Sequence, residues 1–404
     1  MRPVKLAIAL AVALSLSACG GEKTLKIGVA GPLTGKDAVF GAQLKNGVDQ
    51  AVQDINAAGG LNGQKLELVF GDDAADPKQG RSVANTFVGE GVSFVVGHFN
   101  SGVTEPASDI YAEHGILMIT PGSTNPKITD RGLSNVFRTC GRDDQQGKIA
   151  GEYIAQHFKD KKVAIAHDKT TYGKGLADET KKTMNGLGVQ EVLYEGINAG
   201  ERDFSALVSK IKASGAQAVF TGNWGNDLTL LVRALREVGS TARLYTFYGN
   251  ALGAPAAIGE AGVGAVLAVA EWQPNVPGAP SADFRAEFKR RFPDPKDDYL
   301  HARMQVLVEM LAAAIERAGA TEAAAVARAL EGAAYDGRTL GGVHKAVMRA
   351  DDHQLQQPLV VSVMDRAGAP GVPHDVEGSG FGFRVLRRFD SAAAPHACRM
   401  LRPD

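Results

Sequence analysis

Apolar residues along this chain fall into two alternating patterns. Runs with almost continuous apolar positions predict strands at residues 25–30, 65–70, 94–98 and 116–120. Between the first two runs, apolar residues recur at spacings of four and three, which predicts a helix closed by Gly59-Gly60. This stripe consists of Phe40, Leu44, Val48, Val52 and Ile55. Further helices are expected at about 77–89 and 103–114. Apolar strands separated by helices are typical of a parallel sheet covered on both faces.

The same alternation begins again after Cys140. Strands are expected at 163–166, 192–194, 218–221 and 244–247, and helices at about 143–158, 174–187, 204–214 and 227–238. After residue 270 come helical patterns near 281–292, 299–318 and 321–332, then strand-like segments from 343 to 385. These late elements are too few for a third core, so we expect them to complete the two sheets. The predicted fold class is α/β, with two doubly wound parallel-sheet lobes.

The N-terminus has the order of a secretory signal. Arg2 and Lys5 are followed by an apolar run over 6–16 and then by small residues up to Cys19. The run is too short to span a membrane, and no later stretch approaches that length. The residues Leu16-Ser17-Ala18-Cys19 resemble a bacterial lipobox, in which the cysteine is lipidated. We therefore expect a signal peptide over 1–18 and a protein held outside the cytoplasm by a lipid on Cys19.

Charge and cysteine content narrow the function further. The chain has 44 Lys and Arg against 45 Asp and Glu, and loss of Arg2 and Lys5 with the signal leaves 42 basic residues. The charges are interspersed, so nucleic acid is not an expected partner. With Cys19 lipidated, Cys140 and Cys398 form an even pair, for which we predict a disulfide, the alternative being two unpaired thiols. No Cys/His cluster has zinc spacing, so neither a metal nor a cofactor is expected.

Two loops follow predicted strands of the first half, where open α/β sheets bind ligands. Residues 97–104 bring Ser101 and free backbone N–H groups to a helix start, an anion site suited to a carboxylate. The alternative is an ordinary helix N-cap by Ser101. Residues 120–126 add Gly122 and Thr124, although such a loop is also a common turn.

Three aromatic residues follow strands of the second half: Tyr172, Trp224 and Tyr248. A single aromatic there suggests a core lid, whereas three at equivalent strand ends favour a pocket wall. Metalloprotease, serine-nucleophile and catalytic-cysteine motifs are absent from the sequence, so a binding function is expected and an enzyme is not.

Several segments, in order, resemble the branched-chain amino acid binding proteins of bacterial ABC importers. They are DQAVQDINAAGG (49–60), DDAADPKQ (72–79), PASDIY (106–111), GILMITP (115–121) and HDKTTYG (167–173). The resemblance implies a type I periplasmic binding fold with three crossovers, near 139–143, 270–275 and 355–360. Lobe 1 is then expected over 20–141 and 273–356, lobe 2 over 142–272 and 357–390, and a C-terminal tail over 391–404.

The resemblance also implies a ligand site between the lobes. Ser101, Gly122 and Thr124 would hold the α-amino-acid group from lobe 1, and Tyr172 would reach it from lobe 2. Phe40 and Trp224 match aromatic positions beside the ligand side chain.

One position departs from the family pattern. Tyr248, followed by Gly249, stands where amino-acid binders have a glutamate facing the ammonium, and a phenol lacks that charge. Asp227 and Glu271 are alternative acids. The expected ligand is a branched-chain amino acid or a related small carboxylate, with aromatic acids or small amides as the alternative.

The resemblance implies a mechanism of binding rather than catalysis. The lobes close on the solute, and the closed form, expected to be a monomer, docks on the permease subunits of the importer. A ligand-sensing module uses the same fold and is the alternative function.

Overall fold

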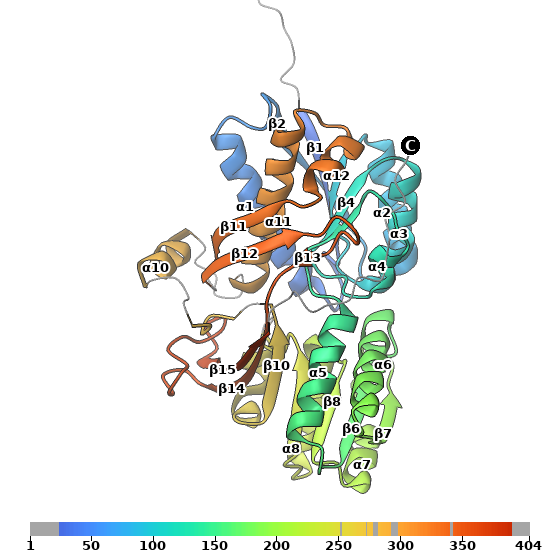
Figure 1. The fold of residues 1–404 in the computed structure, drawn as a ribbon, viewed down its shortest axis with the longest axis vertical. Coiled ribbons are helices and arrows are strands. Elements are labelled where there is room, and N and C mark those ends of the chain that lie inside the picture. The colour runs from blue at the N-terminus through green and yellow to red at the C-terminus, as the bar shows by residue number, and fades with distance from the viewer. Residues whose placement is uncertain are drawn as a thin grey trace, which may run out of the picture.

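The computed structural model describes residues 24–250, 253–271, 273–277, 282–291, 298–339 and 342–389. These residues form two α/β lobes stacked along the long axis of the molecule (Figure 1). The expected signal peptide, Cys19, Cys398 and the tail at 391–404 lie outside the described residues.

The first lobe contains a five-stranded sheet in the order β2-β1-β3-β4-β5, in which every neighbouring pair is parallel. Its N-terminal elements are β1 (Thr24–Gly31), α1 (Ala38–Ala57), β2 (Lys65–Asp72), α2 (Pro77–Gly89), β3 (Phe94–Val96), α3 (Ser101–Glu113), β4 (Leu117–Thr120), α4 (Lys127–Asp130) and β5 (Val136–Arg138). The chain later adds α10 (Ala282–Arg291), α11 (Asp298–Ala318), α12 (Ala323–Leu330), β11 (Ala334–Thr339), β12 (Gly342–Met348) and β13 (Leu355–Gln356).

The second lobe contains a seven-stranded sheet in the order β15-β14-β10-β9-β8-β6-β7. Its elements are α5 (Asp143–His157), β6 (Val163–His167), α6 (Thr171–Gly186), β7 (Glu191–Gly196), α7 (Ser205–Ser214), β8 (Ala218–Thr221), α8 (Gly225–Glu237), β9 (Arg243–Phe247), α9 (Ala254–Ile258), the 3₁₀ turn η1 (Gly259–Gly262), β10 (Val266–Ala270), β14 (Leu359–Arg366) and β15 (Phe381–Phe389). The pairs from β7 to β10 are parallel, whereas β14 and β15 pair antiparallel at one edge.

The late strands depart in part from expectation. β14 and β15 extend the second sheet, but β11, β12 and β13 form a separate three-stranded sheet instead of joining the first. This small sheet has no core of its own, because Tyr335, Ala346 and Met348 pack into the lobe 1 core. Burial on an existing core therefore stabilises these strands without pairing to the main sheet.

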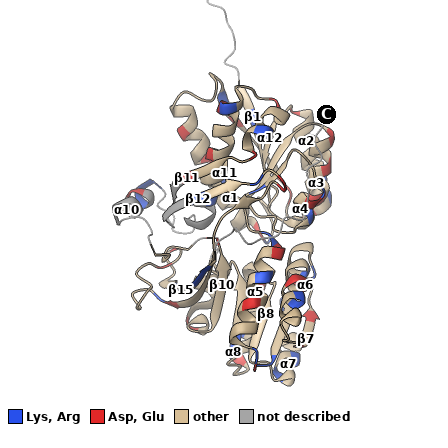
Figure 2. Ribbon diagram, viewed as in Figure 1, with Lys and Arg blue, Asp and Glu red and all other residues tan. Residues whose placement is uncertain are grey.

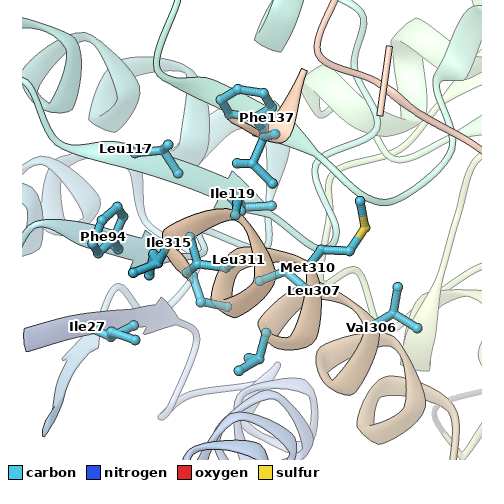
Figure 3. Packing of buried hydrophobic residues seen from close by; sticks show 14 of the residues in the cluster. Ile27, Phe94, Leu117, Ile119, Phe137, Val306, Leu307, Met310, Leu311 and Ile315 are labelled. Atoms are coloured by element: carbon cyan, nitrogen blue, oxygen red, sulfur yellow. The ribbon is translucent and has the colours of Figure 1, made fainter. Parts of the chain in front are cut away.

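Helices cover both faces of the lobe 1 sheet, as the apolar pattern predicts. Side chains alternate along a strand, so Phe94 and Val96 face the helices α1, α11 and α12, while Val95 faces α2 and α3. Figure 3 shows Leu311 and Ile315 of α11 against the strand residues. A segment from late in the chain thus completes the core of the first lobe.

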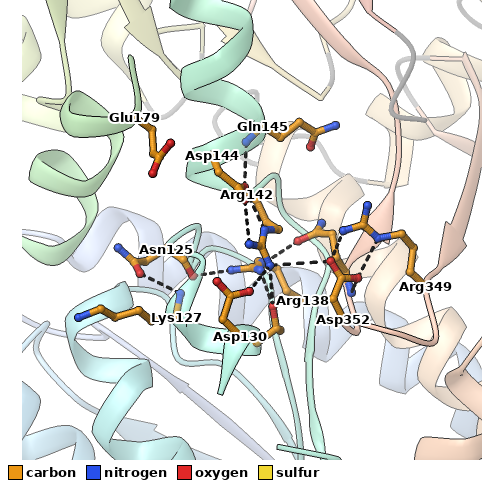
Figure 4. Close-up of polar contacts among 12 residues, drawn as sticks. Asn125, Lys127, Asp130, Arg138, Arg142, Asp144, Gln145, Glu179, Arg349 and Asp352 are labelled. Atoms are coloured by element: carbon orange, nitrogen blue, oxygen red, sulfur yellow. Dashed lines mark hydrogen bonds and ion pairs between the residues drawn. The ribbon is translucent and has the colours of Figure 1, made fainter. Parts of the chain in front are cut away.

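Buried charges gather where the chain passes between the lobes (Figure 4). We call Arg138, Arg142, Arg349, Asp352 and Gln354 the crossover cluster. Arg142 donates to Asp130 and Asp144, both at 2.8 Å. Arg349 pairs with Asp352, and the Arg138 Nε donates to Gln354 at 2.5 Å. The cluster links the first crossover, after β5, to the third, before β14.

Elsewhere, basic and acidic residues are interspersed over both lobes (Figure 2). Within the described part of the chain, no helix combines the length and the apolar character needed to cross a membrane.

Candidate functional site

A cavity of about 430 Å³ lies between the two lobes. Lobe 1 contributes loops that follow β1, β2, β3 and β4, and lobe 2 contributes loops that follow β6, β7, β8 and β9. Both sheets therefore present the carboxyl ends of their strands, the edge at which open α/β sheets bind ligands. The lining residues that the argument uses are Lys36, Phe99, Ser101, Gly122, Lys169, Tyr172, Trp224, Tyr248 and Arg303.

The lobes are closed around this cavity. The Asn125 Nδ2 of lobe 1 donates to the backbone oxygen of Thr171 in lobe 2 at 2.9 Å. The Phe40 ring of lobe 1 lies 4.7 Å from the Trp224 ring of lobe 2, centroid to centroid. A solute in the cavity would contact both lobes, which is the condition for binding to favour closure.

Ser101 is the first residue of α3 and is 2% exposed. The residue before it, Asn100, occupies the N-cap position, and its side chain makes no capping hydrogen bond. The Ser101 Oγ accepts from the Asn125 N–H at 3.3 Å instead of capping the helix. The hydroxyl and the helix N-terminus thus lie at the cavity wall, where both favour an anion.

Gly122 lines the same end of the cavity, and its lack of a side chain is required there. A Cβ at this position would lie 2.5 Å from the Phe99 ring. Thr124 does not line the cavity and is 1% exposed. Among the described residues, the hydroxyls of Thr124 and Tyr172 have no hydrogen-bond partner of ordinary geometry. Such buried hydroxyls call for a polar partner.

Aromatic rings form one wall of the cavity. The Trp224 ring lies 5.8 Å from Phe99 and 6.5 Å from Tyr172, centroid to centroid. Phe40 stands behind these rings rather than at the cavity surface, since it stacks on Phe99 at 5.5 Å and is 3% exposed. The wall suits a flat or branched apolar group.

A polar network occupies the end of the cavity next to Tyr248. The Tyr248 hydroxyl donates to Glu271 at 2.7 Å and accepts from Gln146 at 2.7 Å. Glu271 pairs with Arg303 at 2.6 Å. Gly249, named with Tyr248 from the sequence, does not line the cavity, and a Cβ there would lie 2.3 Å from the Thr246 hydroxyl. Of the alternative acids, Glu271 therefore lies behind Tyr248, whereas Asp227 accepts from the Gly200 N–H at 2.8 Å.

Asp143, at the start of α5, is a further acid close to the site. Its carboxyl is fully buried, and burial raises its pKa to about 8, although the nearby Thr124 hydroxyl opposes this rise. Neither oxygen has a hydrogen-bond partner of ordinary geometry among the described residues. Burial thus disfavours the charged form of this carboxyl.

Sequence reasoning missed Phe99, Gln146 and Arg303. Phe99 lies in the 97–104 loop and follows a predicted strand, as Tyr172, Trp224 and Tyr248 do, so the same pattern could have identified it. Arg303 lies in α11, far along the chain from the loops it contacts, and no local pattern distinguishes it from other helical arginines.

The family model for periplasmic binding proteins matches residues 24–369. The chain belongs to the periplasmic binding protein family. Leu/Ile/Val-binding protein homolog 1 of Brucella abortus is 45% identical over 324 residues, which cover 80% of this chain and 86% of the relative. The relatives of this periplasmic binding protein are solute-binding proteins.

Solved structures share the two-lobed fold. The closed conformation of a leucine-, isoleucine-, valine-, threonine- and alanine-binding protein from Brucella ovis has a TM-score of 0.81 and 22% identity, covering 94% of this chain and 100% of that chain. An ABC-transporter solute-binding protein from Rhodopseudomonas palustris, in complex with 3,4-dihydroxybenzoic acid, has a TM-score of 0.78 and 18% identity. The match covers 91% of this chain and 98% of that chain. This periplasmic binding protein therefore has the type I fold that its sequence predicts.

Proposed function

We propose that this periplasmic binding protein is the solute receptor of an ABC importer, and that it captures a branched-chain amino acid or a related small carboxylate. The observation that carries the proposal is the closed cavity with Ser101 and the α3 N-terminus at one end and an aromatic wall beside it. The helix end and the hydroxyls favour a carboxylate, and the rings favour its apolar part. The 45% identical Brucella relative is named for leucine, isoleucine and valine, which supports the same class.

Aromatic acids are the second candidate ligands. The three rings of Phe99, Tyr172 and Trp224 favour them, because a planar ring gains stacking energy against such a wall. In either case we propose that Ser101, Gly122 and Tyr172 contact the carboxylate, whereas Thr124 lies behind them and does not line the cavity.

We also propose that closure about the crossovers presents a recognisable surface to the permease. The proposed lobes comprise residues 20–141 with 273–356 and residues 142–272 with 357–390, and the order of the strands along the chain supports this division. A solute that contacts one lobe only would bind without favouring closure. A sensing partner in place of a permease is the alternative role.

Export and anchoring complete the proposal. The signal at 1–18 and the lipobox before Cys19 support a lipid-anchored protein outside the cytoplasm. Cys140 is buried, and burial raises the pKa of its thiol to about 12. We propose that Cys140 pairs with Cys398 while the thiol is still accessible. The mass of the exported protein, with and without thiol labelling under denaturing conditions, tests all three features. A mass that retains residues 1–18, or two labelled thiols, would contradict them.

Replacement of Trp224 by alanine tests the site. We expect the variant to bind the preferred solute about 10- to 100-fold more weakly, because it loses about 1.5–3 kcal/mol of aromatic contact. The solute is first found by a thermal-shift screen of amino acids, aromatic acids and small amides, since a ligand of the folded state raises the melting temperature. Affinities are then measured by calorimetric titration.

The control is Phe70→Ala, which removes an aromatic that is 39% exposed and does not line the cavity. Its affinity should equal that of the wild type. Equal loss in both variants, or none in Trp224→Ala, would place the ligand elsewhere.

A further inference from the structure

Arg303 brings a positive charge from α11 into the wall of the cavity. One guanidinium nitrogen donates to the backbone oxygen of Pro121 at 2.8 Å, beside Gly122. Another donates to Glu271 at 2.6 Å, and the guanidinium carbon lies 5.2 Å from the centre of the Tyr248 ring. The side chain is only 11% exposed. Three contacts therefore hold this cation between the loop of Gly122 and Tyr248.

The carboxylate of Glu271 is fully engaged behind Tyr248. One oxygen accepts from the Gly141 N–H at 2.5 Å and from the Tyr248 hydroxyl at 2.7 Å, and the other accepts from Arg303. The side chain is 4% exposed and does not line the cavity. A ligand ammonium would have to displace Arg303 to use this charge, and breaking a buried ion pair costs about 3–5 kcal/mol.

Cations outnumber acids along the described cavity lining. Its cations are Lys36, Lys169 and Arg303, and its one acid, Asp37, pairs with Lys36 at 2.7 Å. An ammonium next to Tyr248 would face a guanidinium within a partly desolvated site, where like charges repel more strongly than in water. A hydroxyl, a ring or a methylene group meets no such repulsion.

We propose that Arg303 makes this site selective for carboxylic acids that lack an α-ammonium group. The inference rests on the proposed function, since it assumes that the cavity binds a carboxylate. Arg303 acts in two ways: it neutralises Glu271, and it occupies the space beside Tyr248 with positive charge. The Ser101 end then binds the carboxylate, while the aromatic wall contacts the rest of the solute.

Asp143 is the other acid that an ammonium could reach. It lies outside the cavity lining and is fully buried, and burial raises the pKa of its carboxyl. An ammonium that used Asp143 would need a carboxylate whose charged form this burial disfavours. The test therefore includes Asp143→Asn, which separates this route from the Glu271 route.

Matched pairs of solutes test the proposal. The pairs are leucine with 4-methylpentanoate and phenylalanine with 3-phenylpropionate, in which only the ammonium differs. We expect calorimetric titration of the wild type to give at least about tenfold tighter binding of each deaminated acid, corresponding to about 1.4 kcal/mol.

Two variants should shift this preference in opposite directions. Arg303→Met releases Glu271 and should move the preference toward the amino acids by about tenfold or more. Glu271→Gln leaves the Arg303 charge uncompensated and should move the binding preference further toward the deaminated acids. The control, Lys169→Met, removes a cavity cation that is not bound to Glu271, and it should weaken both members of a pair alike.

The outcomes separate the two proposals. If the wild type binds leucine or phenylalanine more tightly than the deaminated acids, the inference is overturned and the proposed function still stands. If Asp143→Asn then loses this preference for the amino acids, Asp143 is the counter-charge of the ammonium. An unchanged preference in both Arg303→Met and Glu271→Gln also overturns it. If no small carboxylate of either kind binds the folded wild type, the proposed function itself fails.

Discussion

Replacing Arg138 with methionine is expected to lower the free energy of unfolding by about 3–5 kcal/mol. Arg138 is 0% exposed, and its guanidinium donates to Gln354, to the backbone oxygen of Asn125 at 2.6 Å and to the Thr129 hydroxyl at 2.7 Å. Methionine fills a similar volume but removes these buried hydrogen bonds, and it leaves the side-chain oxygen of Gln354 without its donor. The loss should exceed that of an ordinary core substitution, because several polar groups lose their partner at once.

Urea denaturation followed by circular dichroism measures this effect. The matched control is Arg366→Met, which breaks the ion pair between Arg366 and Glu260. Their side chains are 62% and 61% exposed. Exposed pairs contribute about 0–1 kcal/mol, so the control should unfold near the wild-type midpoint. Equal midpoints for both variants would mean that the crossover cluster does not stabilise the fold.

Replacing Asp143 with asparagine is expected to stabilise the protein by several kcal/mol at pH 8, up to about 5 kcal/mol, and to change little at pH 4. Burial raises the pKa of the folded carboxyl to about 8, whereas the unfolded value is 3.8. Between these values the folded state keeps a proton that the unfolded state releases, so wild-type stability falls as pH rises. Below pH 3.8 both states are protonated and the penalty vanishes. Asparagine is uncharged throughout and escapes the loss.

Denaturation curves at pH 4, 6 and 8 on wild type and Asp143→Asn test this dependence. Asp109→Asn is the control, because its carboxylate is 54% exposed and pairs with Arg131 at the surface. The stability difference between wild type and Asp143→Asn should grow with pH, while that for Asp109→Asn should stay small. A constant difference across the range would show that the Asp143 carboxyl ionises normally in the folded state.

The fold was predictable because its signals are local. The apolar stripe from Phe40 to Ile55 has the period of a helix, and the continuous apolar run at 25–30 is typical of a buried strand. Each pattern lies within a single element, so a short stretch of sequence is enough to recognise it. The separate sheet of β11, β12 and β13 was not predicted. The position of these strands depends on the packing of Tyr335 and Met348 against the lobe 1 core. That core is built from residues far away in the sequence, so a local pattern does not predict the pairing.

The site was predictable in part for a related reason. Ser101, Tyr172 and Trp224 each follow a strand, and topology alone brings parallel strand ends to one edge. Phe40 was named as a site residue from the resemblance alone, and Thr124 from both its loop and the resemblance. In the closed structure neither residue lines the cavity.

The charge balance of the site was beyond sequence reasoning. Glu271 was one of two acids considered, but its engagement depends on Arg303, whose contact at Pro121 joins residues 182 positions apart. No period or motif reports a contact of that range. The ligand class that we propose therefore rests on the geometry at Tyr248 rather than on the aligned glutamate position.

We propose that the two lobes close on a small carboxylate held in the cavity between them. Small-angle X-ray scattering of the mature protein, with and without the solute that most raises its melting temperature, measures this closure. We expect the radius of gyration of the wild type to fall when the solute is added, and that of Trp224→Ala to fall less at the same concentration. A saturating solute that leaves the radius of gyration of the wild type unchanged would contradict it.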